Sequence, residues 1–157
     1  MKIIFLDFDG VINRQVKSMH EDGEWLFDLW VPECVKWLNH ITDATGAKIV
    51  VSSSWKHCGD LPKLKGILKD AGVTGECIGS TPTLEGIDPG CGRGHEIAAW
   101  IYQHWPVESF VILDDGCDMV HLMPRLVRTE SKIGLTEQHS RFAIGQLVAR
   151  YQPRTGK

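Results

Sequence analysis

Two aspartates near the start of the chain, Asp7 and Asp9, follow a short apolar run and stand two positions apart. Positions i and i+2 of an extended segment point to the same side, so both carboxylates can face one small volume. Two carboxylates held that close repel each other, and burying them is costly. A hard divalent cation such as Mg²⁺ is the simplest group that offsets this cost. Gly10 follows directly and lets the chain turn tightly beside the two acids.

Two further polar clusters also follow apolar runs. One run leads into the serines at 52–54, and another leads into Asp114 and Asp115, with Asp118 one turn later. Each cluster alone is explained equally well by the capping of a following helix. Three such clusters at the ends of three apolar runs indicate a shared site instead.

The elements that must position these groups alternate between strands and helices. Near-continuous apolar strands joined by helices are typical of a parallel sheet covered on both faces, and ligands bind such sheets at the carboxyl ends of the strands. We therefore expect an α/β fold in which the three polar clusters meet at one edge of a central parallel sheet. The expected strands are 2–7, 48–52, 76–78, 109–113 and 126–127, and the expected helices are 32–45, 61–71, 94–104, 117–122 and 136–150.

The bulk properties suit one domain, spanning residues 1–157. A net charge of −3 argues against tight, non-specific nucleic-acid binding, so we expect no stable nucleic-acid complex, although a nucleic-acid end remains possible as a substrate. The sequence has no apolar stretch long enough to span a bilayer, no signal peptide and no Cys-x-x-Cys among its five cysteines. These features predict a cytoplasmic protein with reduced thiols and no membrane partner.

The chemistry that suits such a cluster of acids and hydroxyls is phosphoryl transfer. A metal held by Asp7 and one of the later acids can neutralise phosphate oxygens. One carboxylate can then attack phosphorus and form an aspartyl-phosphate. A second carboxylate, two residues on, can protonate the leaving oxygen and later activate water. A hydroxyl and a cation would complete the binding of the remaining phosphate oxygens.

The motifs, in this order, resemble the haloacid dehalogenase (HAD) superfamily of phosphatases and phosphotransferases. The shared pattern is an apolar strand with Asp-x-Asp-Gly, a strand ending in Ser or Thr, a basic residue before a helix, and a strand ending in paired acids; it covers roughly residues 2–120. The resemblance implies a three-layer Rossmannoid fold, a Mg²⁺ cofactor, and a phosphomonoester hydrolase that acts through an aspartyl-phosphate.

The resemblance also implies roles for individual residues. Asp7 resembles the nucleophile, and it would also bind the metal. Asp9 resembles the general acid and base, and its backbone carbonyl would also bind metal. Ser52 resembles the phosphate-binding hydroxyl, with Ser53 as the alternative, and Asp114 matches a Mg²⁺ ligand.

Two further positions of the pattern are less settled in this sequence. Asp118 matches the second acid of the last motif, and Asp115 is the alternative metal ligand. The superfamily usually has a lysine in its third motif, whereas Arg93 occupies the matching place here. Arginine keeps the positive charge and can bind phosphate through two N–H groups. Lys56, four residues past Ser52, is the competing candidate.

Many relatives carry a cap domain over the site, and no cap fits in this sequence. The segment at about 12–30 is only long enough for a flap, and the span from Trp55 to Gly92 is filled by a helix, a short strand and a loop. An uncapped site admits bulky substrates, such as a protein phosphoresidue, a nucleic-acid terminus or a nucleotide held by the flap. The candidates for substrate contact are Gly10, Asn13, Ser53 and Lys56.

The Ser-Ser-Ser-Trp-Lys run and the capless form are similar to the uncapped branch associated with nucleic-acid end repair. That similarity implies a 3′-phosphatase. Aromatic side chains near the site could stack on a base or pack the flap onto the core. These aromatic residues are Trp25, Phe27, Trp30 and Trp55.

Two other classes of protein remain open as alternatives. A phospho-aspartate signalling module also uses an acid cluster, a hydroxyl and a lysine, but its acid pair normally comes early in the chain. A non-catalytic HAD-like binding domain would keep the fold without turnover. Release of phosphate from a phosphomonoester distinguishes both from a phosphatase.

Overall fold

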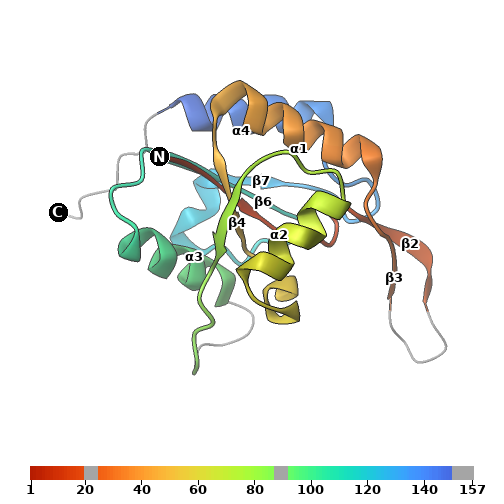
Figure 1. The fold of residues 1–157 in the computed structure, drawn as a ribbon, viewed down its shortest axis with the longest axis horizontal. Coiled ribbons are helices and arrows are strands. Elements are labelled where there is room, and N and C mark those ends of the chain that lie inside the picture. The colour runs from red at the N-terminus through yellow and green to blue at the C-terminus, as the bar shows by residue number, and fades with distance from the viewer. Residues whose placement is uncertain (20–24, 87–91, 150–157) are drawn as a thin grey trace.

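A five-stranded, all-parallel sheet lies at the centre of the computed structural model, which describes residues 1–19, 25–86 and 92–149. The strand order is β5-β4-β1-β6-β7 (Figure 1). The predicted α/β fold with a parallel sheet between helical layers is confirmed, and no cap domain is present among the described residues. The strands are β1 (Lys2–Leu6), β4 (Lys48–Val51), β5 (Cys77–Ser80), β6 (Ser109–Asp114) and β7 (Leu126–Arg128).

Helices cover both faces of this sheet. The buried side chains of α1, α2 and α4 join one hydrophobic cluster, and those of α3 and η2 join the cluster on the other face. Figure 1 shows α1 and α4 lying along one face of the sheet and α3 on the opposite one. The helices are α1 (Pro32–Thr45), α2 (Leu61–Asp70), α3 (Gly92–Gln103) and α4 (Glu137–Val148), and the 3₁₀ helices are η1 (Ser54–Cys58) and η2 (Val120–Arg125).

The strands supply side chains to the two clusters in alternation. In β1, Ile4 and Leu6 pack on the α1 side, whereas Ile3 and Phe5 pack on the α3 side. This period of two is the reason why β1 is apolar throughout, since both of its faces are buried. The next residue in the alternation, Asp7, therefore points to the α3 side.

The segment at about 12–30, expected to be a flap, contains a hairpin that the sequence did not predict. Strands β2 (Arg14–Met19) and β3 (Trp25–Asp28) pair antiparallel and project away from the sheet (Figure 1). The side chains of Trp25 and Phe27 lie outside the described part of the chain, so their predicted stacking or packing stays a prediction.

Several element boundaries also differ from the prediction. The helix expected at 94–104 begins at Gly92, and β5 continues to Ser80, into the expected loop. The short helix expected at 117–122 is instead the 3₁₀ helix η2, which begins at Val120. Residues 116–119 are not helical and are fixed by other hydrogen bonds: the Gly116 N–H donates to the Asp114 carboxylate, and the Gly94 N–H donates to the Asp118 carbonyl.

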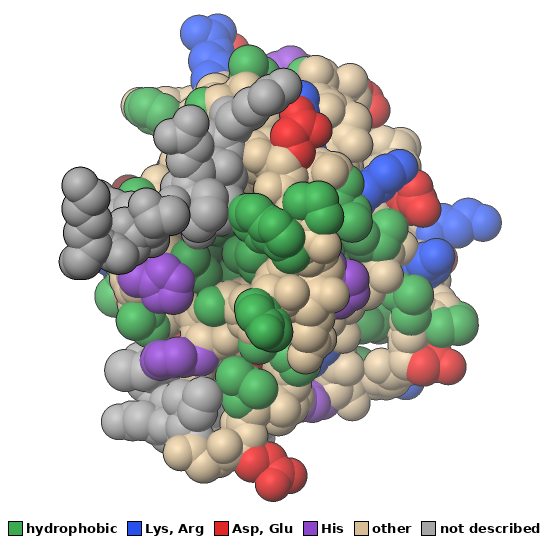
Figure 2. Space-filling view, turned by 90° about the vertical axis from the view of Figure 1, so that its left-hand side faces the viewer, with side chains coloured by type: hydrophobic (Ala, Val, Ile, Leu, Met, Phe, Trp, Pro, Cys, Tyr) green, Lys and Arg blue, Asp and Glu red, His purple; other side chains and the backbone are tan. Residues whose placement is uncertain are grey.

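The amino-terminal edge of the sheet differs from the edge that carries the acids. The face opposite the hairpin gathers hydrophobic side chains near its middle, with few lysines or arginines there (Figure 2). Met1, Tyr102 and Trp105 are exposed large hydrophobic residues; Met1 precedes β1, Tyr102 lies in the last turn of α3, and Trp105 lies between α3 and β6. None of the helices in the described ranges combines the length and the apolar character needed to cross a membrane.

Candidate active site

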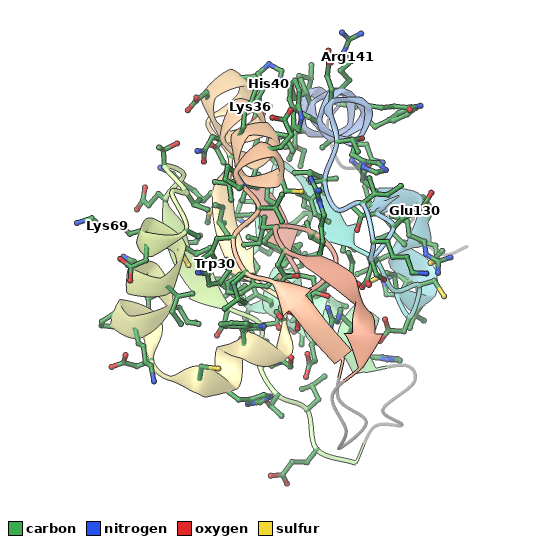
Figure 3. The ribbon with its side chains drawn as sticks, turned by 90° about the vertical axis from the view of Figure 1, so that its right-hand side faces the viewer. Trp30, Lys36, His40, Lys69, Glu130 and Arg141 are labelled. Carbon is green, nitrogen blue, oxygen red and sulfur yellow. The ribbon has the colours of Figure 1, made fainter. Side chains whose placement is uncertain are left out.

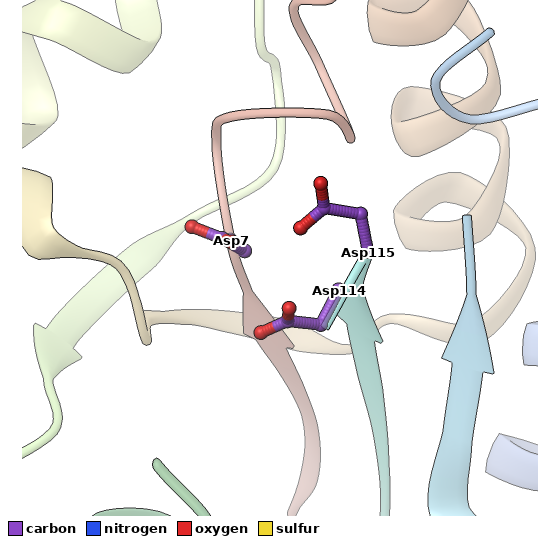
Figure 4. A group of neighbouring side chains, drawn as sticks. All are labelled: Asp7, Asp114 and Asp115. Atoms are coloured by element: carbon purple, nitrogen blue, oxygen red, sulfur yellow. The ribbon is translucent and has the colours of Figure 1, made fainter. Parts of the chain in front are cut away.

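Three carboxylates meet where β1 and β6 end. The two strands are parallel neighbours with Leu6 beside Leu113, so Asp7 and Asp114 follow at the same level. Asp115 comes next in the chain, and each of the three acids offers an oxygen within 4.8 Å of the others (Figure 4). Asp7 and Asp114 are buried and Asp115 is partly buried. We call these three residues the acid cluster.

Ser52 continues the same row of side chains on the neighbouring strand β4. Its N–H donates to the Leu6 carbonyl, which keeps it level with Asp7. The preceding alternate residue, Val50, packs in the α3-side cluster, so Ser52 also points to that side. Its hydroxyl is buried and has no hydrogen-bond partner in the structure. Burying a hydroxyl without a hydrogen-bond partner costs free energy, and the Ser52 hydroxyl can donate a hydrogen bond to an oxygen of a bound ligand.

Arg93, at the start of α3, forms ion pairs with two carboxylates of the acid cluster. Its Nη1 lies 2.8 Å from Asp7 Oδ2 and 2.6 Å from Asp114 Oδ2. The start of α3 is fixed against the segment after β6, because a Cβ on Gly94 would lie 2.5 Å from the Met119 backbone. This close contact requires glycine and places Arg93 beside the two acids.

The charges within this site do not balance. Burial raises the pKa of Asp7 against the opposing effect of Arg93. Burial, together with the charge of Asp7, raises the pKa of Asp114 to about 7. Burial disfavours the charged form of Arg93, but the two aspartates outweigh it and raise the pKa of the guanidinium. Two acids of the cluster share one guanidinium, which leaves an excess of negative charge once all three ionise.

The acid cluster fits a hard divalent cation. Its donors are carboxylate oxygens, which Mg²⁺ prefers, and its excess negative charge would be offset by such an ion. Asp7, Asp114 and Asp115 are the residues that could hold it. Asp118 is partly buried, and its carboxylate lies outside the cluster, so its assignment as a ligand stays a prediction.

Asp9 lies outside the acid cluster and is held by different partners. Asn13 donates from Nδ2 to Asp9 Oδ1 at 2.7 Å, and Trp55 donates from Nε1 to both Asp9 oxygens at 3.2 Å. Asn13 is fully buried, and its Oδ1 accepts the Gly10 N–H at 2.9 Å. Both ends of this amide therefore hold the turn after β1, which favours a structural role over the predicted substrate contact.

Gly10 allows that turn to approach the acid cluster closely. It adopts a φ of +77°, and a Cβ there would lie 2.5 Å from Asp115 Oδ2. The Thr129 hydroxyl donates to its carbonyl at 2.7 Å. On the other side, the Ser53 hydroxyl hydrogen-bonds to Asp7 and caps η1 by accepting the Trp55 N–H.

Lys56, the second basic candidate, is buried among other partners. Its Nζ donates to Glu96 at 2.6 Å, to the Pro82 carbonyl at 3.0 Å and to the Thr81 hydroxyl at 3.3 Å. All three of its donors are satisfied by groups outside the acid cluster. Arg93 is therefore the basic candidate that the fold brings to Asp7.

Sequence reasoning missed several contacts that shape the site. Ser131 donates its hydroxyl to the Asp115 carboxylate, and Thr129 holds Gly10. The rule that polar residues at strand ends meet at one edge could have found Thr129, since it directly follows β7. The contact between Trp55 and Asp9 had no comparable signal, because nothing in the sequence shows where an indole N–H points.

The comparisons with known proteins agree with this geometry. No curated protein matches the chain. The family model described as the HAD domain in Swiss Army Knife RNA repair proteins matches residues 3–140, which include the acid cluster, Ser52, Arg93 and the turn after β1. The resemblance to the HAD superfamily predicted from the motifs is confirmed. The chain belongs to the family of HAD domains found in Swiss Army Knife RNA repair proteins.

Proposed function

We propose that this protein is a Mg²⁺-dependent phosphomonoester hydrolase whose substrate is a phosphorylated nucleic-acid end. The observation that carries the proposal is the environment of Asp7, a buried carboxylate at the carboxyl edge of the sheet, between Arg93 and two further acids. The family description, which names RNA repair proteins, supports an RNA end as the substrate.

Asp7 acts as the nucleophile in this proposal. One of its carboxylate oxygens forms a bond to phosphorus while the bond from phosphorus to the leaving oxygen breaks, which yields an aspartyl-phosphate. Asp9 donates its proton to the leaving oxygen. Asp9 then takes a proton from water, the water oxygen bonds to phosphorus, and the bond to Asp7 breaks to release inorganic phosphate.

The other residues bind the phosphoryl group and balance its charge. Arg93 stays within reach of Asp7 and can pair with the phosphate oxygens. The Ser52 hydroxyl can donate its proton to another phosphate oxygen, which would satisfy its buried oxygen. Mg²⁺ held by the acid cluster would supply further positive charge against the phosphate oxygens.

The open surroundings of the site favour a bulky substrate. A pocket of about 420 Å³ lies beside the acid cluster and shares Asp115 with it. Arg128 and Lys132 on its rim can meet the phosphodiester backbone that leads away from a terminal phosphate. Figure 3 shows Glu130, another residue of this pocket, and Trp30 on opposite sides of the hairpin. The remaining lining residues are Thr129 and Ser131.

The test is release of phosphate in the presence of Mg²⁺ from a matched set of substrates. The set contains RNA and DNA oligonucleotides with a 3′-phosphate, the same RNA with a 5′-phosphate, mononucleotides and an aryl phosphate. Asp7→Asn is the matched control, since it keeps the shape of the side chain and removes the nucleophile. Thermal melting establishes that the variant is folded.

The proposal predicts release from an oligonucleotide end, dependent on Mg²⁺ and lost in Asp7→Asn. Release from small phosphates alone would keep the mechanism and move the substrate to nucleotides or metabolites. Absence of release from every substrate, with folded protein and Mg²⁺ present, would overturn the proposal in favour of a non-catalytic domain.

A further inference from the structure

Trp55 contacts the carboxylate of Asp9 directly, and this contact defines a role for its indole ring. We propose that Trp55 is a positioning residue, which holds Asp9 in the orientation needed to deliver a proton to the leaving oxygen. The inference rests on the proposed function, because it deepens the assignment of Asp9 as the general acid. It assigns Trp55 a role other than stacking on a base.

The geometry of the contact points to orientation of the whole carboxylate. The indole Nε1 lies 3.2 Å from both oxygens of Asp9, so its one N–H is shared between them. Asn13 donates to Oδ1 at 2.7 Å. The carboxylate is thus held by two donors from different segments, the turn after β1 and η1.

The ring of Trp55 is itself fixed by packing. Its centroid lies 5.5 Å from that of Phe8 and 5.4 Å from that of Trp30, and Phe8 and Trp30 also contact each other in a T-shaped arrangement at 6.0 Å. Trp30 lies at the root of the hairpin, just after β3 (Figure 3). The backbone N–H of Trp55 is held by the Ser53 hydroxyl at 3.4 Å. Two neighbouring aromatic rings and a cap therefore set the direction of the indole N–H.

A general acid needs this kind of support because it acts only when its proton points at the leaving oxygen. Small losses of alignment slow such reactions strongly. Asp9 is partly exposed, so packing around its own side chain restricts it less than the buried Asp7. The donors on Trp55 and Asn13 supply the restriction instead.

The leaving group provides a selective test. An alkoxide, such as the hydroxyl oxygen of a ribose, needs protonation as it leaves, whereas p-nitrophenolate leaves without help. Asp9→Asn and Trp55→Phe should therefore both lower kcat/KM for a 3′-phosphorylated RNA more than kcat/KM for p-nitrophenyl phosphate. General acid catalysis contributes about 10²-fold or more to the rate. We expect Trp55→Phe to lower kcat/KM roughly tenfold for the RNA substrate and to leave kcat/KM for p-nitrophenyl phosphate unchanged.

The comparison uses the ratio of the two kcat/KM values in one sample. This ratio is unaffected by any fraction of the protein that fails to fold, so a destabilised Trp55→Phe variant still gives an answer. Trp37→Phe is the matched control, because its ring contacts His40 and Lys36 instead of Asp9. It should leave the ratio unchanged.

The double variant completes the test. Once Asp9 is Asn, the further change Trp55→Phe should leave the ratio unchanged, since the indole no longer has an acid to orient. If Asp9→Asn lowers the ratio and Trp55→Phe lowers both rates equally, Trp55 merely supports packing and the inference is wrong. If Asp9→Asn itself leaves the ratio unchanged, the assignment of Asp9 as the acid fails first, and this inference fails with it.

Discussion

Two partly buried cations near the carboxyl edge of the sheet, Arg93 and Lys56, differ in what surrounds them. Arg93 faces the acid cluster, where its single positive charge contacts two carboxylates, those of Asp7 and Asp114. Lys56 faces one carboxylate, that of Glu96, and two neutral oxygens, so its charge is matched. The site around Arg93 has an excess of negative charge, whereas the charges of Lys56 and Glu96 balance and the donors of Lys56 are all hydrogen-bonded.

The comparison shows that burial of a charge does not identify a catalytic residue. Lys56 is the more deeply buried of the two, with 7% of its side chain exposed against 24% for Arg93. A buried pair with every donor satisfied has nothing left to offer a ligand. The unbalanced charges and the unpaired Ser52 hydroxyl mark the site at Arg93 instead.

The largest expected effect is on turnover. Replacing Arg93 by Ala removes a charge that pairs with the phosphate oxygens, and loss of one such donor typically costs about 10²–10³-fold in kcat. Lys56→Ala should change kcat of the folded protein by less than about tenfold, since Lys56 does not contact the acid cluster. Phosphate release, normalised to the folded fraction, measures both. A larger loss in Lys56→Ala than in Arg93→Ala would reverse the two assignments.

The second effect is on stability, and here Lys56 should matter more than Arg93. Lys56→Met leaves the partly buried carboxylate of Glu96 without its partner. Because 18% of the Glu96 side chain is exposed, we expect the free energy of unfolding to fall by less than for a fully buried pair, by about 1–3 kcal/mol. Adding Glu96→Gln should restore much of this loss. Urea denaturation measures the three proteins. Equal stability of Lys56→Met and the unchanged protein would show that the pair contributes nothing.

The third effect is a dependence of stability on pH that comes from the acid cluster. Without metal, the folded-state pKa of Asp114 is raised from 3.8 to about 7, by burial and then by the charge of Asp7. The folded state therefore holds this proton more tightly than the unfolded state, and stability falls as pH rises from about 4 to 7.

Asp114→Asn removes the carboxyl group whose ionisation lowers the stability. In EDTA, the Tm of the variant relative to that of the unchanged protein should therefore be higher at pH 8 than at pH 5. Added Mg²⁺ should raise Tm of the unchanged protein at pH 8, and the variant should lose most of that rise. Thermal melting at the two pH values gives both results. An identical effect of the variant at pH 5 and pH 8 would contradict the electrostatic account of the cluster.

The smallest effect concerns the acid that lies outside the cluster. Asp118→Asn should change the Mg²⁺ concentration that gives half-maximal activity by less than about threefold, whereas Asp115→Asn should raise it by roughly tenfold or more. Mg²⁺ titration of phosphate release compares the two variants. A larger change in Asp118→Asn would return the ligand role to the residue that the motif favours.

The sequence predicted the sheet and the edge at which its polar groups meet, because both depend on local patterns. Apolar strands ending in Asp7, Ser52 and Asp114 determine where these groups meet, since parallel strands end at one edge. The hairpin was missed because neither of its strands shows a clear alternation of apolar and polar residues. The pairing of strands without this alternation does not follow from their pattern of residues.

The choice between Arg93 and Lys56 also needed the structure. Both are basic residues near a strand end or helix start, and their side chains are long enough to reach several partners. Glu96 and Pro82, which engage Lys56, come from segments distant in the chain. The same limit hid the bond from Trp55 to Asp9, since side-chain direction across segments follows from packing and not from spacing.

The central claim is that Asp7 carries the phosphoryl group, and trapping it is the most direct test. Asp9→Asn with p-nitrophenyl phosphate should form the intermediate without an acid and break it down slowly without a base. Acid quenching and peptide mass analysis should then find one phosphoryl group on Asp7, absent when Asp7→Asn is added. Turnover of the substrate with no phosphoryl group on Asp7, or with the group on another residue, would contradict the account.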